Sequence, residues 1–191
     1  MLKIGLTGGI GSGKTTVSGI IQELGYPVYH SDAAAARIAN EEAAVREALV
    51  EAFGAEYYNA DGTLDRPRLA SLIFNNAEAL ARANAIIHPA VTGDFQRWSL
   101  SRDEPLVFFE SAILFEAGLA GLFDAVITVV ADEETRVERV MLRDRVPREK
   151  VMERLKHQTS NAAQSRFIVY NNRGDMLVEQ LLQIIQILEQ W

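Results

Sequence analysis

The residues best suited to chemistry form one glycine-rich segment near the start of the chain. Residues 8–15 read GGIGSGKT, which matches the pattern G-x-x-x-x-G-K-[S/T] of phosphate-binding loops. Glycines permit backbone conformations in which successive N–H groups point inward and bind an anion. The helix expected to follow adds the positive end of its dipole. The segment therefore predicts a site for the phosphates of a nucleotide.

Individual side chains in this segment have distinct expected roles. Lys14 is predicted to be catalytic, because its ammonium group can reach the β- and γ-phosphates, and Thr15 is predicted to bind Mg²⁺ through its hydroxyl. Thr16 can donate a hydrogen bond to the α-phosphate. The remaining phosphate-binding positions are Gly9, Gly11, Ser12 and Gly13. The alternative is a glycine-rich turn that binds nothing, and chance would produce such a match in roughly one chain in a hundred.

The segments around the loop have the pattern that such a site requires. Leu2–Thr7 is a short β-prone run, and apolar residues from Lys14 to Leu24 recur with helical spacing. Further strands are expected at 26–30, 106–110, 125–130 and 167–170. The second and third of these are almost entirely apolar, as are strands that are buried on both faces of a parallel sheet.

Helical patterns separate these five strands along the chain. They are expected at 32–53, from Asp65 onward, and at 76–100, 132–144, 148–161 and 174–191. The alternation predicts an α/β fold of the P-loop NTPase type, with a doubly wound, five-stranded parallel sheet. The stretch between 32 and 104 is too long for one crossover and is expected to form an inserted helical lobe. Pro89 would kink or stop a helix within it.

The composition is that of a soluble globular protein. Of the 191 residues, 48% are hydrophobic and 24% are charged, and the absence of cysteine excludes disulfides, thiolate metal sites and cysteine nucleophiles. A net charge of −7 argues against nucleic acid as a partner. The most apolar stretch, 105–131, contains three acidic residues, so no membrane segment is expected. We expect a cytoplasmic protein that is a monomer or a small homo-oligomer.

Basic residues are concentrated in one part of this acidic chain. Residues 136–156 contain eight basic and four acidic side chains. Arginines that close over a γ-phosphoryl group can stabilise the charge that develops during its transfer. Arg139 and Arg143 are four residues apart and would share one helix face, with Arg143 the stronger catalytic candidate. A solvated helix with many salt bridges is the alternative.

Several short motifs occur in a characteristic order along nearly the whole chain. They are residues 6–17, Ser31-Asp32, His88-Pro89, residues 113–116 (ILFE), Arg139, Arg143, Gln158 and Asn171-Asn172. In this combination the sequence resembles the dephospho-coenzyme A (dephospho-CoA) kinase family. The phosphate loop alone is generic, whereas HP, LFE and the late asparagines are much more specific.

This resemblance implies transfer of the γ-phosphoryl group of ATP, with Mg²⁺, to the ribose 3′-hydroxyl of dephospho-CoA, the last step of CoA synthesis. It also implies a nucleotide-binding core (1–32, 105–138 and 166–191), an acceptor lobe (33–104) and a lid (139–165). The sequence departs from the family pattern at the second strand end, where His30 replaces an aspartate. A second departure follows the third strand, where Glu110 replaces an aspartate and a proline is lost.

Three residues are candidates for binding the acceptor. Asp32 directly follows a predicted strand, where open α/β sheets bind ligands, and could accept the hydroxyl proton. The alternative role for Asp32 is a helix N-cap. Arg37 lies one position after the place where the family often has a basic residue. The resemblance places His88 in the acceptor lobe, although a lone histidine is more often structural.

Two further candidates lie at strand ends. Glu110 ends the third strand and could hold Mg²⁺ through water, or it could be an ordinary strand-end carboxylate. Asn171 follows the last strand, where its amide could bind the adenine edge of ATP or could serve in a turn. Arg139 is also predicted to bind ATP.

Two other functions are compatible with the phosphate loop. One is a different small-molecule kinase of the nucleoside-monophosphate type. The other is a regulatory protein that binds ATP without transferring a phosphoryl group. The sequence lacks the Asn-Lys-x-Asp motif that reads guanine, which disfavours a GTP switch.

Overall fold

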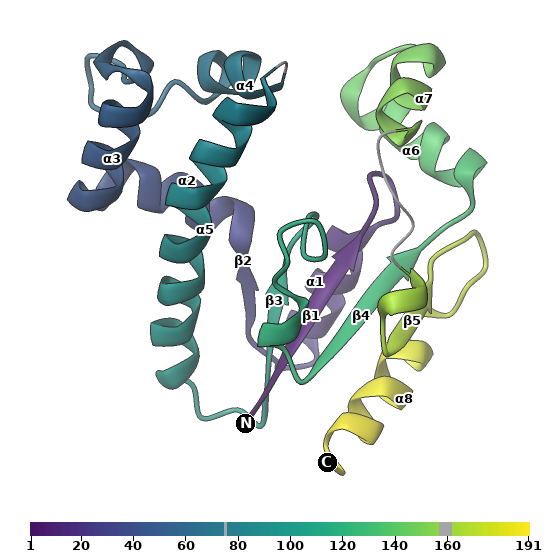
Figure 1. The fold of residues 1–191 in the computed structure, drawn as a ribbon. Coiled ribbons are helices and arrows are strands. Elements are labelled where there is room, and N and C mark those ends of the chain that lie inside the picture. The colour runs from purple at the N-terminus through teal and green to yellow at the C-terminus, as the bar shows by residue number, and fades with distance from the viewer. Residues whose placement is uncertain (75, 157–161) are drawn as a thin grey trace. The chain divides into compact units, whose positions relative to one another are not determined.

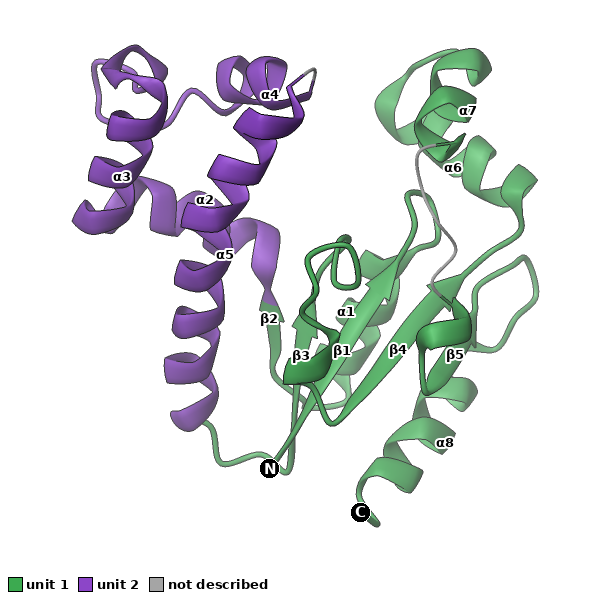
Figure 2. Ribbon diagram, in the orientation of Figure 1, with its two compact units in different colours: residues 1–29, 102–191 green, residues 30–101 purple. Residues whose placement is uncertain are grey.

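The chain forms two compact units. The computed structural model describes residues 1–74, 76–156 and 162–191, so the predicted motif residue Gln158 lies outside the described part. One unit comprises residues 1–29 and 102–191, and the other comprises residues 30–101 (Figure 2). The expected acceptor lobe, 33–104, differs from the second unit by a few residues at each end. The expected lid, 139–165, groups with the first unit, and its separate identity stays a prediction.

A five-stranded sheet organises the first unit (Figure 1). The strands are β1 (Leu2–Gly8), β2 (Val28–His30), β3 (Leu106–Glu110), β4 (Ala125–Val130) and β5 (Phe167–Tyr170). Their order is β2-β3-β1-β4-β5, and β1 pairs in parallel with both β3 and β4. The predicted α/β class with a five-stranded parallel sheet is confirmed. Because β1 is central, the loop after it emerges from the middle of the sheet.

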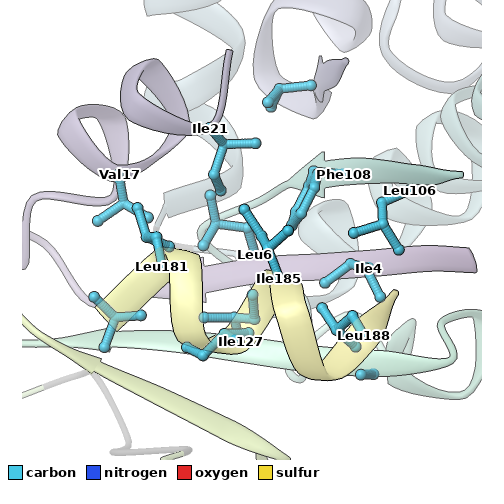
Figure 3. Close-up of a cluster of buried hydrophobic side chains, with 14 of the residues drawn as sticks. Ile4, Leu6, Val17, Ile21, Leu106, Phe108, Ile127, Leu181, Ile185 and Leu188 are labelled. Atoms are coloured by element: carbon cyan, nitrogen blue, oxygen red, sulfur yellow. The ribbon is translucent and has the colours of Figure 1, made fainter. Parts of the chain in front are cut away.

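Two helices cover one face of this sheet. They are α1 (Lys14–Glu23) and α8 (Leu177–Leu188). Figure 3 shows their apolar side chains, among them Ile21 and Leu181, converging on Ile4, Leu6 and Ile127 of the strands. All five of these side chains are fully buried. The helix α8 begins three residues later than predicted, because the chain at Gly174 has a φ of 95° that interrupts a helix.

Aromatic side chains fill part of the opposite face. The ring of Phe109 stacks on Tyr29 with centroids 5.5 Å apart and contacts Phe123 at 5.2 Å. Every residue of β3 is buried, and β4 is buried except at its last residue. The apolar runs in the sequence therefore correspond to strands that are covered on both faces.

The helices α6 (Glu133–Asp144) and α7 (Arg148–Lys156) follow β4. Their facing residues Val137, Val140, Val151 and Leu155 form a small buried cluster of their own, separate from the sheet core. The side chain of Ile10, in the middle of the glycine-rich loop, packs against this cluster. Helix α6 is therefore attached to the loop as well as to the sheet.

The second unit is helical, as predicted for the inserted lobe. It contains α2 (Ser31–Glu41), α3 (Ala43–Phe53), α4 (Arg66–Phe74) and α5 (Ala77–Leu100). Its buried residues include Ile38, Leu49, Leu69 and Phe95. The predicted cap at Asn76 is confirmed, because its side chain accepts a hydrogen bond from the Ala79 N–H at 3.0 Å.

Two details of the helical unit differ from the prediction. The single helical stretch 32–53 is divided at Glu42, whose ψ of 111° is extended and ends α2. Pro89 does not stop α5, which continues from Ala77 to Leu100. A proline removes one N–H donor, and the long helix retains its other hydrogen bonds on both sides. None of the described helices combines the length and apolar character needed to cross a membrane.

The C-terminal end of α8 is attached to the rest of the first unit by a tyrosine. The Tyr26 hydroxyl donates a hydrogen bond of 2.6 Å to the Glu189 carboxylate. This hydrogen bond, with burial and the negative charge of Glu189, raises the pKa of Tyr26 to about 12. The contribution to stability is therefore complete below pH ~10, the unperturbed tyrosine value. It is lost as the pH rises through about 12.

We expect Tyr26→Phe to lower the free energy of unfolding by about 1 kcal/mol at pH 8, because one hydrogen bond is lost. Urea denaturation measures the difference, which should shrink as the pH is raised from ~10 toward 12. The control is Tyr57→Phe, because the Tyr57 side chain makes ring contacts but no hydrogen bond with described residues. Equal losses in the two variants would contradict the prediction.

Candidate active site

The glycine-rich loop joins the end of β1 to the start of α1. Gly11 and Gly13 have φ values of 76° and 90°, in the left-handed region that side chains with a Cβ rarely adopt. The N–H groups of both glycines donate no hydrogen bond within the described part of the chain. The Ser12 hydroxyl is also buried and has no partner there. The loop thus holds unused donors beside the start of a helix, which is an arrangement that binds anions.

Packing also requires glycine at these two positions. A Cβ on Gly11 would lie 2.6 Å from the Arg136 carbonyl oxygen, and a Cβ on Gly13 would overlap the Asn171 amide nitrogen. The loop is therefore enclosed on its outer side by α6 and by the segment after β5.

Three side chains donate hydrogen bonds to the carbonyl oxygens of the loop. Asn171 Nδ2 donates to Ser12 O at 2.7 Å, and Arg136 Nε donates to Ile10 O at 2.9 Å. Arg139 Nη1 makes longer contacts of 3.4 Å with the carbonyls of Gly11 and Ser12. Asn171 and Arg139 were predicted to bind ATP, and the structure places both at the loop. Nothing in their contacts addresses adenine, so that role stays a prediction.

Arg136 was not among the predicted site residues. It lies on the same face of α6 as Arg139, since residues three apart on a helix are neighbours. Its position in the basic segment and this spacing are the signals that could have found it. Burial lowers the pKa of the half-buried Arg136 guanidinium below its usual value.

The ammonium group of Lys14 forms an ion pair with Glu110. The Nζ–Oε1 distance is 2.6 Å, and the two side chains are only 14% and 11% exposed. The sheet register produces this contact, because Glu110 lies opposite Leu6 on the strand that leads into the loop. The structure thus gives Glu110 a partner that the sequence did not predict, and its expected role at Mg²⁺ stays a prediction.

A cavity of about 230 Å³ lies beside the loop. Its walls include the loop residues Gly8, Gly9 and Ser12 and the hydroxyl-bearing Thr7 and Thr128. Three charged residues also line it: Glu116, Glu133 and Arg136. Glu116 belongs to the ILFE motif, for which no role was predicted. The cavity adjoins the loop at Ser12, so a phosphorylated ligand at the loop could extend into it.

Asp32 lies in the first turn of α2, in the helical unit. Its side chain is exposed and makes no hydrogen bond or ion pair with a described residue. The N-cap of α2 is His30, and no side chain forms a capping hydrogen bond there. The alternative role of Asp32 as an N-cap is therefore wrong, and the carboxylate remains available for a ligand.

Arg37 and His88 lie in the same unit as Asp32. The Arg37 guanidinium forms ion pairs with Asp94 at 2.5 Å and Glu41 at 3.9 Å. His88, on α5, is half-buried, and burial lowers its pKa below the usual value. Neither arrangement tests the predicted contact with the acceptor, which stays a prediction for both residues.

Arg143 is 62% exposed at the end of α6. Its guanidinium donates to the carboxylate of Asp144 at 2.7 Å, and this hydrogen bond raises the pKa of Arg143. Arg154 of α7 donates to the same carboxylate at 2.8 Å. Unlike Arg139, Arg143 makes none of its described hydrogen bonds with the loop, and its predicted catalytic role stays a prediction.

The sequence profile of the dephospho-CoA kinase family matches residues 2–176. The chain belongs to the dephospho-CoA kinase family. The dephospho-CoA kinase of Porphyromonas gingivalis is 40% identical over 190 residues, which cover 97% of this chain and 94% of that protein. That of Salinibacter ruber is 44% identical over 163 residues, covering 84% and 82%.

Solved structures share the fold of this chain. A crystal structure of a Thermus thermophilus protein matches this kinase with a TM-score of 0.86 and 34% identity, and covers 97% of this chain and 96% of that one. The dephospho-CoA kinase from Campylobacter jejuni gives a TM-score of 0.70 at 24% identity, with 98% and 97% covered, which supports the fold. A shikimate kinase from Acinetobacter baumannii, with a TM-score of 0.54 at 16% identity and 98% and 94% covered, shares the general fold.

We expect Gly13→Ala to weaken nucleotide binding by at least about tenfold, the factor that corresponds to 1.4 kcal/mol. The added Cβ would displace Asn171 and strain a residue with a φ of 90°. Isothermal titration with ADP measures the loss. Gly19→Ala is the matched control, because Gly19 lies inside α1 with nothing near its Cβ position. That control should bind normally and gain up to ~1 kcal/mol of stability from helix propensity. Equal binding by both variants would contradict the prediction.

Proposed function

We propose that this kinase transfers the γ-phosphoryl group of ATP to the ribose 3′-hydroxyl of dephospho-CoA, giving CoA and ADP. The observation that carries the proposal is the loop of unused N–H donors with Lys14 at its end, in a chain of this family. The bond between the γ-phosphorus and the bridging oxygen breaks, and a bond to the 3′-oxygen forms. The hydroxyl proton leaves to a base.

The loop residues are suited to the charges of this reaction. The N–H groups of Gly11 and Gly13 would bind phosphate oxygens, and the buried Ser12 hydroxyl could donate there too. The Lys14 ammonium would leave Glu110 for the β- and γ-phosphates, where it stabilises negative charge in the transition state. Displacement of water from the loop strengthens these interactions.

The exposed hydroxyl of Thr15 and, through water, the carboxylate of Glu110 would hold a Mg²⁺ ion. This small donor set fits the ion, because Mg²⁺ is usually held by few protein ligands together with phosphates and water. When bound, Mg²⁺ would neutralise phosphate charge. It would also give Glu110 a new cationic neighbour when Lys14 turns to the nucleotide.

Asp32 is the proposed base. Its carboxylate is exposed and makes no hydrogen bond with a described residue, so nothing in the helical unit competes for the hydroxyl proton. Arg37 and His88 are proposed to bind the acceptor, and Arg139 and Asn171 to bind ATP. Arg143 is proposed to stabilise the transferred group from the lid. The cytoplasmic location and the oligomeric state stay predictions.

An acceptor panel tests the proposed reaction. ADP release is measured by a coupled assay with ATP, Mg²⁺ and, in turn, dephospho-CoA, AMP, CMP and shikimate, with mass spectrometry of the acceptor. We expect turnover of dephospho-CoA alone and a product heavier by one phosphoryl group. Turnover of AMP, CMP or shikimate instead would indicate a different kinase. Binding of ATP without acceptor-dependent ADP release would indicate the regulatory function. Lys14→Ala, which removes the cation of the loop, provides the inactive reference.

We expect Asp32→Asn to lower kcat by about 10²–10⁴, because the amide cannot accept the proton. The KM for ATP should change little, since Asp32 is proposed to act on the acceptor. Steady-state kinetics in both substrates measure the two effects. Glu47→Gln removes an exposed carboxylate from α3 of the same unit and should leave kcat unchanged. A change confined to the KM for ATP would contradict the role of Asp32 as base.

A further inference from the structure

The orientation of a peptide group links the two sides of the phosphate loop. In a planar trans peptide the C=O of one residue and the N–H of the next point in opposite directions. A donor that holds a carbonyl on the outer side of the loop therefore also directs the following N–H toward the inner side. In a short glycine-rich loop this matters, because glycine itself restricts the backbone least.

The carbonyl oxygens that side chains hold on the outer side of the loop belong to the same peptide groups as the unused N–H donors. Arg136 Nε holds the Ile10 carbonyl at 2.9 Å, and the N–H that follows this carbonyl is that of Gly11. Asn171 Nδ2 holds the Ser12 carbonyl at 2.7 Å, and the N–H that follows is that of Gly13. Both N–H groups lack a partner in the described chain. Each of these two peptide groups thus has an unused N–H on one side and a carbonyl oxygen held by a side chain on the other.

The backbone of α6 also fits closely against the loop. The Cβ position of Gly11 lies 2.6 Å from the Arg136 carbonyl oxygen and 3.0 Å from the Arg136 Cα, so the two backbones touch. The Ile10 side chain packs on the cluster formed by α6 and α7. Figure 1 shows the loop at the end of β1 next to these helices. A rotation of the Ile10–Gly11 peptide would break the hydrogen bond and disturb both the backbone contact with Arg136 and the packing of Ile10.

We propose that Arg136 is a positioning residue that, through the Ile10 carbonyl, keeps the Gly11 N–H directed toward the phosphates. The inference rests on the proposed function, since it takes the loop as the site of the ATP phosphates. Arginine suits this task because its planar guanidinium keeps its charge when half-buried and donates in fixed directions. A hydrogen bond to a charged phosphate is among the stronger ones, so loss of its alignment should be measurable.

The test uses two variants of Arg136 and one matched control. Arg136→Met keeps most of the apolar stem and removes every donor, whereas Arg136→Lys keeps the charge without the planar group. Arg148→Met is the control, because Arg148 lies on α7, is 45% exposed and forms its described ion pair with Glu134 on the surface. Circular dichroism and thermal unfolding confirm that each variant is folded.

The first readout is the binding of Mg-ADP and of Mg-pyrophosphate by isothermal titration. We expect Arg136→Met to weaken both ligands by about tenfold to a hundredfold, the range for one hydrogen bond to a charged group. Pyrophosphate has no base, so an equal loss for both ligands indicates an effect at the phosphates. Arg136→Lys should recover part of the loss, and Arg148→Met should bind normally.

The second readout is the amide resonance of Gly11 in ¹⁵N-labelled protein without ligand. If Arg136 acts through the loop, this resonance should shift or broaden in Arg136→Met, whereas those of Gly25 and Gly118 should not move. An unchanged Gly11 resonance together with weaker pyrophosphate binding would mean that Arg136 contacts phosphate directly, which overturns the positioning role. Normal ligand binding by Arg136→Met would overturn the inference alone. Failure of the unaltered kinase to bind ADP would overturn the proposed function as well.

Discussion

The candidate site depends on one constraint, which is the direction of a few peptide groups in a loop of five residues. An anion can be bound by backbone N–H groups only if several of them point to the same place. Folding does not favour this arrangement by itself, because buried donors without partners cost free energy, about 1–3 kcal/mol each. Contacts on the outer side of the loop maintain the arrangement. Hydrogen bonds to the carbonyls of Ile10 and Ser12, and the packing of Ile10 against α6 and α7, oppose collapse of the loop.

The same constraint explains why several segments of the first unit hold the loop. It follows the central strand β1, which is paired on both sides, and leads directly into α1. The segments that hold its carbonyls come from α6 and from the turn after β5, more than a hundred residues later. The doubly wound topology brings these segments together, because the ends of parallel strands lie along one edge of the sheet. The loop is thus a local motif whose geometry is set by distant parts of the sequence.

Features that are set by neighbouring residues could be predicted from the sequence, whereas features that are set by distant segments could not. The strands β3, β4 and β5 were predicted with their observed bounds, because each is a short, mainly apolar run with high strand propensity. The phosphate loop was predicted because its glycines and Lys14 are contiguous. Arg136 was missed because its role depends on a contact with Ile10 across 126 positions. The ion pair between Lys14 and Glu110 likewise depends on the register of β1 against β3, which no local pattern specifies.

Helix boundaries were harder to predict for a different physical reason. The break at Glu42 lies within an alanine-rich stretch that has high helix propensity throughout. It is therefore set by how α2 and α3 pack in their own unit rather than by a residue that breaks helices. The opposite error occurred at Pro89, where a residue that usually breaks helices lies within a helix of 24 residues. The tertiary contacts of buried neighbours such as Val91 and Phe95 outweigh the local preference.

The candidate residues fall into two groups, which differ in whether a ligand must displace an existing contact within the protein. The Gly11 and Gly13 N–H groups, the Ser12 hydroxyl and the Asp32 carboxylate have no partner in the described chain, so a ligand meets them without displacing a protein contact. The other group already has charged partners: Lys14, Arg37 and Arg143. For Lys14, exchanging Glu110 for a phosphate costs free energy, because Glu110 is almost buried and would be left without a counterion. A nucleotide that arrives with a divalent cation would remove this difficulty if the cation took the proposed place beside Glu110. The pairing of Lys14 with Glu110 would therefore favour the metal-bound nucleotide over the free nucleotide.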